Sequence, residues 1–126
     1  MKNFLGILAI SLSSMLVAQA AEPAHVDGKA ATVLVQMKKA TVLDVRSAEE
    51  YAEGHIDQAV NIDFLDDSFE SKVAKLDKAK PYLVHCAGGG RSTNSLEVFK
   101  KLGFTNITHL DGGLKAYTKA GGAVTK

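Results

Sequence analysis

The sequence predicts an α/β fold in which a four- to five-stranded, mainly parallel sheet carries helices on both faces. Short apolar runs rich in β-branched residues alternate along the chain with segments whose apolar residues recur at helical spacing. Parallel strands need a crossover between them, usually a helix, and those helices cover both faces of the sheet. A hydrophobic content of 46% is enough for one core in a chain of 126 residues.

The first half of the chain reads as strands and helices in alternation. Capping residues and spacing of apolar side chains place the element boundaries. In order, we expect a helix capped by Asp27 that runs to about Lys39, a strand at 41–45, a short helix capped by Ser47, a strand at 59–62, and a helix at 67–77.

The second half repeats this alternation. The run "PYLVH" (81–85) has the continuous apolar character of a buried strand, and Gly103 stands where a helix would stop. In order, we expect a strand at 81–85, a helix at 91–102, a strand at 106–110 and a closing helix within 112–121.

Residues 1–20 read as a secretory signal peptide. Lys2 precedes an apolar run, and the segment closes on Ala18-Gln19-Ala20, a small-residue cleavage pattern. The run from Phe4 to Val17 has fourteen residues, whereas a membrane-spanning helix needs about twenty. We therefore expect a periplasmic protein without stable membrane anchoring after processing. Residues 21–25 are expected to form a linker, and residues 26–124 one domain.

The charge distribution argues against nucleic acid as a partner. The chain has 15 basic and 14 acidic residues, and its lysines are scattered among acids. Nucleic-acid binding is indicated by a basic patch or stripe. No such footprint is present in the sequence.

Cys86 is the only cysteine, and its setting points to chemistry. An exported domain usually pairs its cysteines in disulfides, so an unpaired one suggests a reactive thiol. Cys86 follows a predicted strand and precedes Ala87, Gly88, Gly89, Gly90 and Arg91 at a predicted helix start. Glycines with positive φ would turn amide groups inward, and the helix N-terminus would add its positive end. Both effects favour a thiolate, and Arg91 offers donors for an anionic substrate.

Three motifs make the sequence similar to the rhodanese family of sulfurtransferases. They are "DVRSAEEYAEGHIDQAVNI" (44–62), "HCAGGGRS" (85–92) and "LDGGLKAYTKAGG" (110–122). The resemblance implies a rhodanese-like fold over residues 26–124 and a Cys86 persulfide formed from thiosulfate or a similar donor. The backbone N–H groups of residues 87–91 would hold the outer sulfur, and a thiol or cyanide would accept it. No cofactor is implied.

Two alternatives to a thiosulfate sulfurtransferase stay open. One is a persulfide carrier that passes sulfur to a partner protein, whose identity the sequence does not give, without turning over small molecules. The other is a cysteine enzyme acting on phosphate or arsenate, which would place its arginine six positions after the cysteine. Here Arg91 is five positions after Cys86, a spacing that favours sulfur transfer.

Histidines and acids near the motifs receive structural interpretations. His85 stands where the family often has tyrosine and could modulate the proton balance of Cys86. Asp44, Arg46 and Glu50 are expected to form a structural polar network. The other histidines have no partners at ligand spacing in the sequence, so no metal site is expected.

Overall fold

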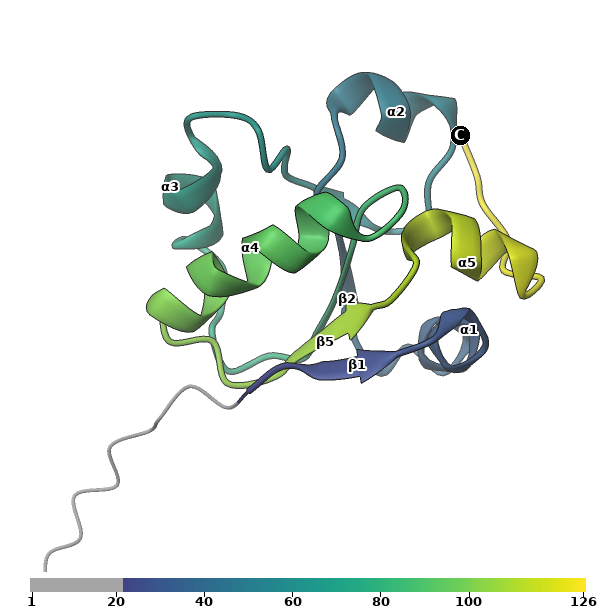
Figure 1. The fold of residues 1–126 in the computed structure, drawn as a ribbon, viewed down its shortest axis with the longest axis horizontal. Coiled ribbons are helices and arrows are strands. Elements are labelled where there is room, and N and C mark those ends of the chain that lie inside the picture. Colours follow the sequence, from purple (N-terminus) through teal and green to yellow (C-terminus); the bar gives the residue numbers. More distant parts are fainter. Residues whose placement is uncertain (1–21) are drawn as a thin grey trace, which may run out of the picture.

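The computed structural model describes residues 22–126, and the predicted signal peptide lies outside this range. Five strands and five helices alternate along the described chain (Figure 1). They are β1 (Ala24–Val26), α1 (Gly28–Gln36), β2 (Thr41–Asp44), α2 (Ala48–Glu53), β3 (Val60–Asn61), α3 (Phe69–Val73), β4 (Tyr82–His85), α4 (Gly90–Lys101), β5 (Ile107–Leu110) and α5 (Gly113–Lys119).

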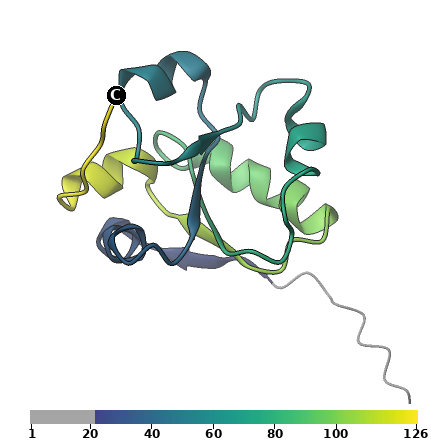
Figure 2. The same cartoon turned by 180° about the vertical axis from the view of Figure 1, so that it is seen from behind.

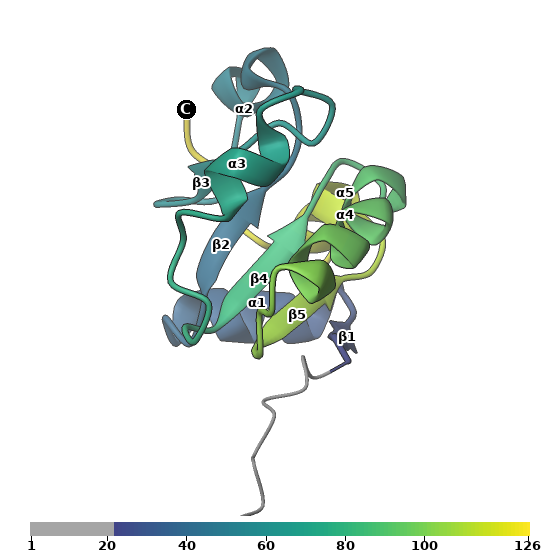
Figure 3. The same cartoon turned by 90° about the vertical axis from the view of Figure 1, so that its left-hand side faces the viewer.

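The strands form one sheet in the order β1-β5-β4-β2-β3, and all four pairings are parallel. The predicted α/β class and strand number are therefore confirmed. Figure 3 shows β2, β4 and β5 running side by side in the same direction. After β2 the chain continues toward one edge of the sheet, and after β4 toward the other. The carboxyl ends of β2 and β4 thus flank a topological switch point, where ligands gather in open α/β sheets.

Helices cover both faces of the sheet, as predicted. Alternate side chains of a strand point to opposite faces, so Leu43 and Val84 enter one core while Val42 and Leu83 enter the other. Helices α3 and α4 cover the first core, and α1 and α5 cover the second (Figures 1 and 2). The continuous apolar character of β2 and β4 reflects this burial on both sides.

Most element boundaries lie within one to three residues of the prediction, and α1 ends at Gln36 instead of about Lys39. Two differences are larger. Ala24 and His25, expected in a linker, lie in β1, which pairs with β5. The helix expected at 67–77 is limited to Phe69–Val73, because tighter i→i+3 turns flank it at both ends, such as Phe69 N to Asp66 O and Leu76 N to Val73 O. Within residues 22–126, no helix is both long and apolar enough to cross a membrane.

Candidate active site

Cys86 lies directly after β4, at the carboxyl edge of the sheet beside the switch point, and only 1% of its surface is exposed. Both predictions for its position, at a strand end and before a helix, are confirmed. Helix α4 starts four residues later at Gly90. The thiol therefore lies near the first backbone N–H groups of this helix, which have no hydrogen-bond acceptor within the helix itself.

The loop after Cys86 directs donors at its sulfur. The amide N–H of Gly89 lies 3.1 Å from Sγ, and the hydroxyl of Ser92 lies 3.3 Å from it. Gly89 has φ +113°, a conformation that favours glycine. We expected positive φ throughout the glycine cluster, but Gly88 and Gly90 do not have it. A single left-handed residue is enough to turn the chain into α4.

The third motif, at 110–122, forms backbone hydrogen bonds with this loop. Leu114 N donates to the carbonyl of Cys86 at 2.8 Å, and Lys115 N donates to that of Ala87 at 3.2 Å. A Cβ at Gly113 would collide with the Ala87 carbonyl, so only glycine permits this approach. The motifs at 85–92 and 110–122 thus meet around one cysteine.

These contacts lower the pKa of the Cys86 thiol. Burial alone raises that pKa, because it disfavours the charged form. The Ser92 hydroxyl and the nearby amide groups of Ser92, Gly89 and Arg91 outweigh burial, since their N–H and O–H dipoles favour the thiolate. Cys86 is therefore set up as a nucleophile at a lower pH than an ordinary thiol.

Arg91 is held by Glu50 of α2. Its guanidinium donates to both carboxylate oxygens, at 2.7 and 2.9 Å. The pair bridges the switch point, because Glu50 follows β2 and Arg91 follows β4. Glu50 also completes a capping box with Ser47. The hydrogen bond from Arg91 is the largest contribution to lowering the pKa of Glu50 to about 2.

The network expected from Asp44, Arg46 and Glu50 is formed only in part. Arg46 lies 5% exposed and pairs with the fully buried Asp44, at 2.6 Å between Nη2 and Oδ2. Arg46 also donates to the carbonyl of Gly54 at 2.8 Å. This pair ties the end of β2 to the end of α2, whereas Glu50 belongs to the site.

His85 points away from the thiol. Its Nδ1 lies 2.9 Å from the carbonyl oxygen of Cys86, and since a carbonyl only accepts, Nδ1 carries the hydrogen. Nε2 has no hydrogen-bond partner among residues 22–126 and lies 3.7 Å from Oδ2 of Asp44. Burial lowers the pKa of His85, so the ring is neutral and this approach is not an ion pair. Its influence on Cys86 passes through the backbone.

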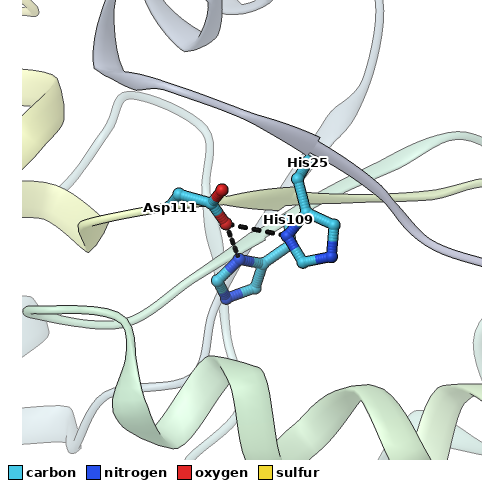
Figure 4. Close-up of side chains that lie close together, drawn as sticks. All are labelled: His25, His109 and Asp111. Atoms are coloured by element: carbon cyan, nitrogen blue, oxygen red, sulfur yellow. Dashed lines mark hydrogen bonds and ion pairs between the residues drawn. The ribbon is translucent and has the colours of Figure 1, made fainter.

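A second polar group lies behind Ser92. The Ser92 Oγ is 2.7 Å from Nε2 of His109, and Nδ1 of His109 is 2.7 Å from Oδ1 of Asp111. His25 of β1 places its own Nδ1 2.8 Å from the same oxygen (Figure 4). Register explains the meeting, because His25 and His109 are directly paired residues of β1 and β5.

Sequence reasoning missed this group, which we call the histidine cluster (His25, His109 and Asp111). One nitrogen of each histidine and one carboxylate oxygen of Asp111, the atoms that could bind a metal ion, lie within 4.8 Å of one another. The argument that these histidines lack partners is therefore wrong. Both Nδ1 atoms are at hydrogen-bond distance from the carboxylate, and we interpret the cluster as a hydrogen-bonded group. The expectation of no metal stays a prediction. Ser92, by contrast, stands inside "HCAGGGRS" and could have been singled out there.

A hollow of about 400 Å³ lies at the opposite end of the sheet from Cys86. Thr41 and Pro81, at the amino ends of β2 and β4, belong to its lining. It is remote from the strand ends that carry the site, and we assign it no part in the chemistry at Cys86.

Comparison with known proteins decides the family. The family model of the rhodanese-like domain matches residues 29–120, which is most of the chain. The chain belongs to the rhodanese family of sulfurtransferases. The rhodanese resemblance of the three motifs is thereby confirmed. The fold agrees too, since the crystal structure of a rhodanese-related protein from Thermoplasma volcanium matches with a TM-score of 0.68 and 30% identity, over 83% of this chain and 98% of that one.

Relatives of this rhodanese-family chain have different names. Over 90 residues it is 31% identical to "Thiosulfate sulfurtransferase GlpE" of Shewanella oneidensis, covering 69% of this chain and 87% of the relative. Over 96 residues it is 35% identical to "tRNA uridine(34) hydroxylase" of Pelagibacter ubique, covering 75% of this chain and 32% of the relative. The chain thus spans about a third of the hydroxylase and most of the sulfurtransferase.

Proposed function

We propose that this protein moves a sulfane sulfur from thiosulfate, or a similar donor, to a thiophilic acceptor through a persulfide on Cys86. The thiolate attacks the outer sulfur of thiosulfate, a new S–S bond forms at Cys86, and sulfite leaves with the electron pair of the old bond. An acceptor thiol or cyanide then attacks the outer sulfur and regenerates the thiolate. No cofactor is required for either step.

The observation that carries this proposal is the set of donors around Sγ. The Gly89 amide and the Ser92 hydroxyl, at 3.1 and 3.3 Å, stabilise negative charge on sulfur. Gly88 and Gly90 are exposed, and in the described part of the chain a side chain added at either glycine would meet no atom within 4 Å, so the rim of the loop is open to a donor or acceptor. The coverage of 87% of a relative named thiosulfate sulfurtransferase supports this donor.

The phosphate or arsenate alternative finds less support. An oxyanion enzyme of that kind would place its arginine six positions after the cysteine, whereas Arg91 is five positions after Cys86. The persulfide carrier differs from the enzyme only in how fast small molecules discharge the sulfur.

Steady-state kinetics distinguish these functions. With purified protein lacking residues 1–20, we expect sulfite and thiocyanate to form in equal amounts from thiosulfate and cyanide, with ping-pong kinetics. Cys86→Ser should abolish both products. Sulfite release limited to one equivalent would support the carrier, and hydrolysis of a phosphate ester dependent on Cys86 would contradict both sulfur functions.

We also propose that the protein works in the periplasm after removal of residues 1–20. The layout of the first twenty residues supports export. Intact mass of the secreted protein should correspond to a chain that begins near Ala21. A secreted protein that retains residues 1–20 would contradict this proposal.

A further inference from the structure

The side chain in hydrogen-bond contact with the thiol of Cys86 is that of Ser92. A thiol must lose its proton before its sulfur becomes a nucleophile, and Cys86 is only 1% exposed. Ser92, itself 0% exposed, contacts Sγ on one side and the ring of His109 on the other. His109 is 2% exposed. A buried serine therefore separates a buried thiol from a buried imidazole.

The hydroxyl hydrogen of Ser92 is available to both neighbours. A third acceptor, the carbonyl of Gly89, lies 3.2 Å from Oγ. That carbonyl already accepts from the backbone N–H of Thr93 at 3.0 Å and from the Thr93 hydroxyl at 2.7 Å. Two acceptor sites are all a carbonyl offers. The Ser92 hydrogen is thus directed at Cys86 or at His109.

Asp111 fixes the tautomer of His109. Hydrogen bonds from His25 and then from His109 lower the pKa of Asp111, so the group is a carboxylate and only accepts. Both Nδ1 atoms that face its Oδ1 therefore carry hydrogen (Figure 4). The ring of His109 is left with Nε2, the atom next to Ser92, as its site for gaining or losing a proton.

We propose that His109, acting through Ser92, accepts the thiol proton of Cys86. This inference deepens the proposed function and rests on it. At the start, the S–H of Cys86 donates to Oγ of Ser92, whose own hydrogen donates to the bare Nε2 of His109. The S–H bond and the old O–H bond break, while a new O–H bond and an Nε2–H bond form. Thiolate and imidazolium result, and the total charge is unchanged.

Both ends of this transfer satisfy every hydrogen bond in the chain. After it, Ser92 donates to the thiolate, Nε2 of His109 donates to Ser92, and Nδ1 still donates to Asp111. The carboxylate stabilises the imidazolium as it does in a serine–histidine–aspartate triad. Cys86 stays anionic as thiolate and as persulfide, so the proton remains on His109 throughout the cycle.

Other ionisable groups face His109 from each neighbouring element. His25 approaches from β1 with its ring centroid 5.3 Å away, and Asp111 follows β5. From β4 and the residue after it come His85 and Cys86. From α4, the hydroxyls of Ser92 and Thr93 contact the ring. Among these groups, Asp111 is the carboxylate in direct contact with the ring.

The test is the pH profile of Cys86 alkylation by iodoacetamide, in the wild type and in His109→Gln. Glutamine can still donate to Ser92 but cannot take up a proton. Below about pH 7 we expect alkylation of this variant to be about tenfold slower or more, the effect of one pKa unit. At a pH above the pKa of Cys86 in both proteins, the two alkylation rates should converge. Alkylation needs no sulfur donor, so this result is independent of whether the protein transfers sulfur.

Two further variants make the result decisive. Asp111→Asn keeps an acceptor oxygen but removes its charge, and alkylation should slow in the same pH range, by less. His55→Gln is the control, since that imidazole stacks on Tyr51 and contacts its carbonyl, and its profile should match the wild type. Profiles of His109→Gln and wild type that coincide would overturn the proposal. Equal slowing of His109→Gln at every pH would also overturn it, because that pattern indicates a structural role.

Discussion

Arg91 and Glu50 form a two-point ion pair that joins the first turn of α4 to α2, with N–O distances of 2.7 and 2.9 Å. The residues are 41 positions apart in sequence. Their pairing connects the two sides of the switch point beside Cys86 and fixes the position of the guanidinium. The thiolate of Cys86 also contributes to raising the pKa of Arg91, after the larger effect of Glu50, so the two charges interact.

We expect Arg91→Ala to lower kcat/KM for thiosulfate about ten- to a hundredfold, since one lost contact to a charged group costs about 1.5–3 kcal/mol. Glu50→Gln should have a much smaller effect, because the positive charge of Arg91 is retained. Steady-state kinetics of both variants check this. Equal losses would mean that Arg91 acts only as a structural strap, and no loss in either would exclude a role in binding the donor.

The same pair should make stability depend on pH. The pKa of Glu50 is lowered from 4.5 to about 2 on folding, so its contribution is present above the unfolded value and is lost as pH falls through the folded one. Side-chain exposures of 27% for Arg91 and 35% for Glu50 reduce it to about 1 kcal/mol by solvent screening. Urea unfolding should show Glu50→Gln destabilised near neutral pH, with the difference shrinking in acid. A difference independent of pH would contradict this assignment.

Ser92→Ala should raise the pKa of Cys86, because the Ser92 side chain makes the largest contribution to lowering it. Loss of a hydrogen bond to a charged group should slow alkylation of Cys86 near neutral pH about tenfold or more. Ser95→Ala is the matched control, since Ser95 is equally buried on α4 but donates to the carbonyl of Ser92 at 2.6 Å. Equal reactivity of the two variants would show that the Ser92 hydroxyl does not stabilise the thiolate.

Gly89→Ala should damage the site, and Gly88→Ala should not. Alanine at φ +113° is strained by about 1–2 kcal/mol, and relief of that strain would move the amide away from Sγ. Gly88 lacks positive φ, and its added Cβ would meet open space. Thermal unfolding together with thiocyanate formation checks both variants. Comparable activity in both would contradict the role assigned to the Gly89 amide.

Local patterns were sufficient to predict most of the fold. Ser47 and Asp27 were predicted as helix caps, and their side chains accept from Glu50 N and Ala30 N. Cys86 was predicted at a strand end, because a continuous apolar run indicates burial on both faces. Strand β1 was missed, since three residues that include a histidine carry almost no strand signal.

The parts of the site that sequence could not predict all depend on strand order. His25 and Asp111 are 86 positions apart, and only the pairing of β1 with β5 brings them together. Glu50 reaches Arg91 because β2 and β4 are neighbours in the sheet. Predicting that five strands are parallel does not specify which ones are adjacent. Contacts within one motif, such as that of Gly89 with Cys86, could be predicted from the sequence because they do not depend on strand order.

The most direct test of the account is the intact mass of the protein after incubation with thiosulfate. We predict an increase by the mass of one sulfur atom, located on Cys86 by peptide mapping, and its removal by cyanide with recovery of the original mass. Cys86→Ser, folded like the wild type, should show no increase, since its hydroxyl is not ionised at neutral pH and cannot carry a persulfide. A wild-type protein that gains no sulfur from thiosulfate or another sulfane donor, or a Cys86→Ser variant that gains it, would contradict the central claim.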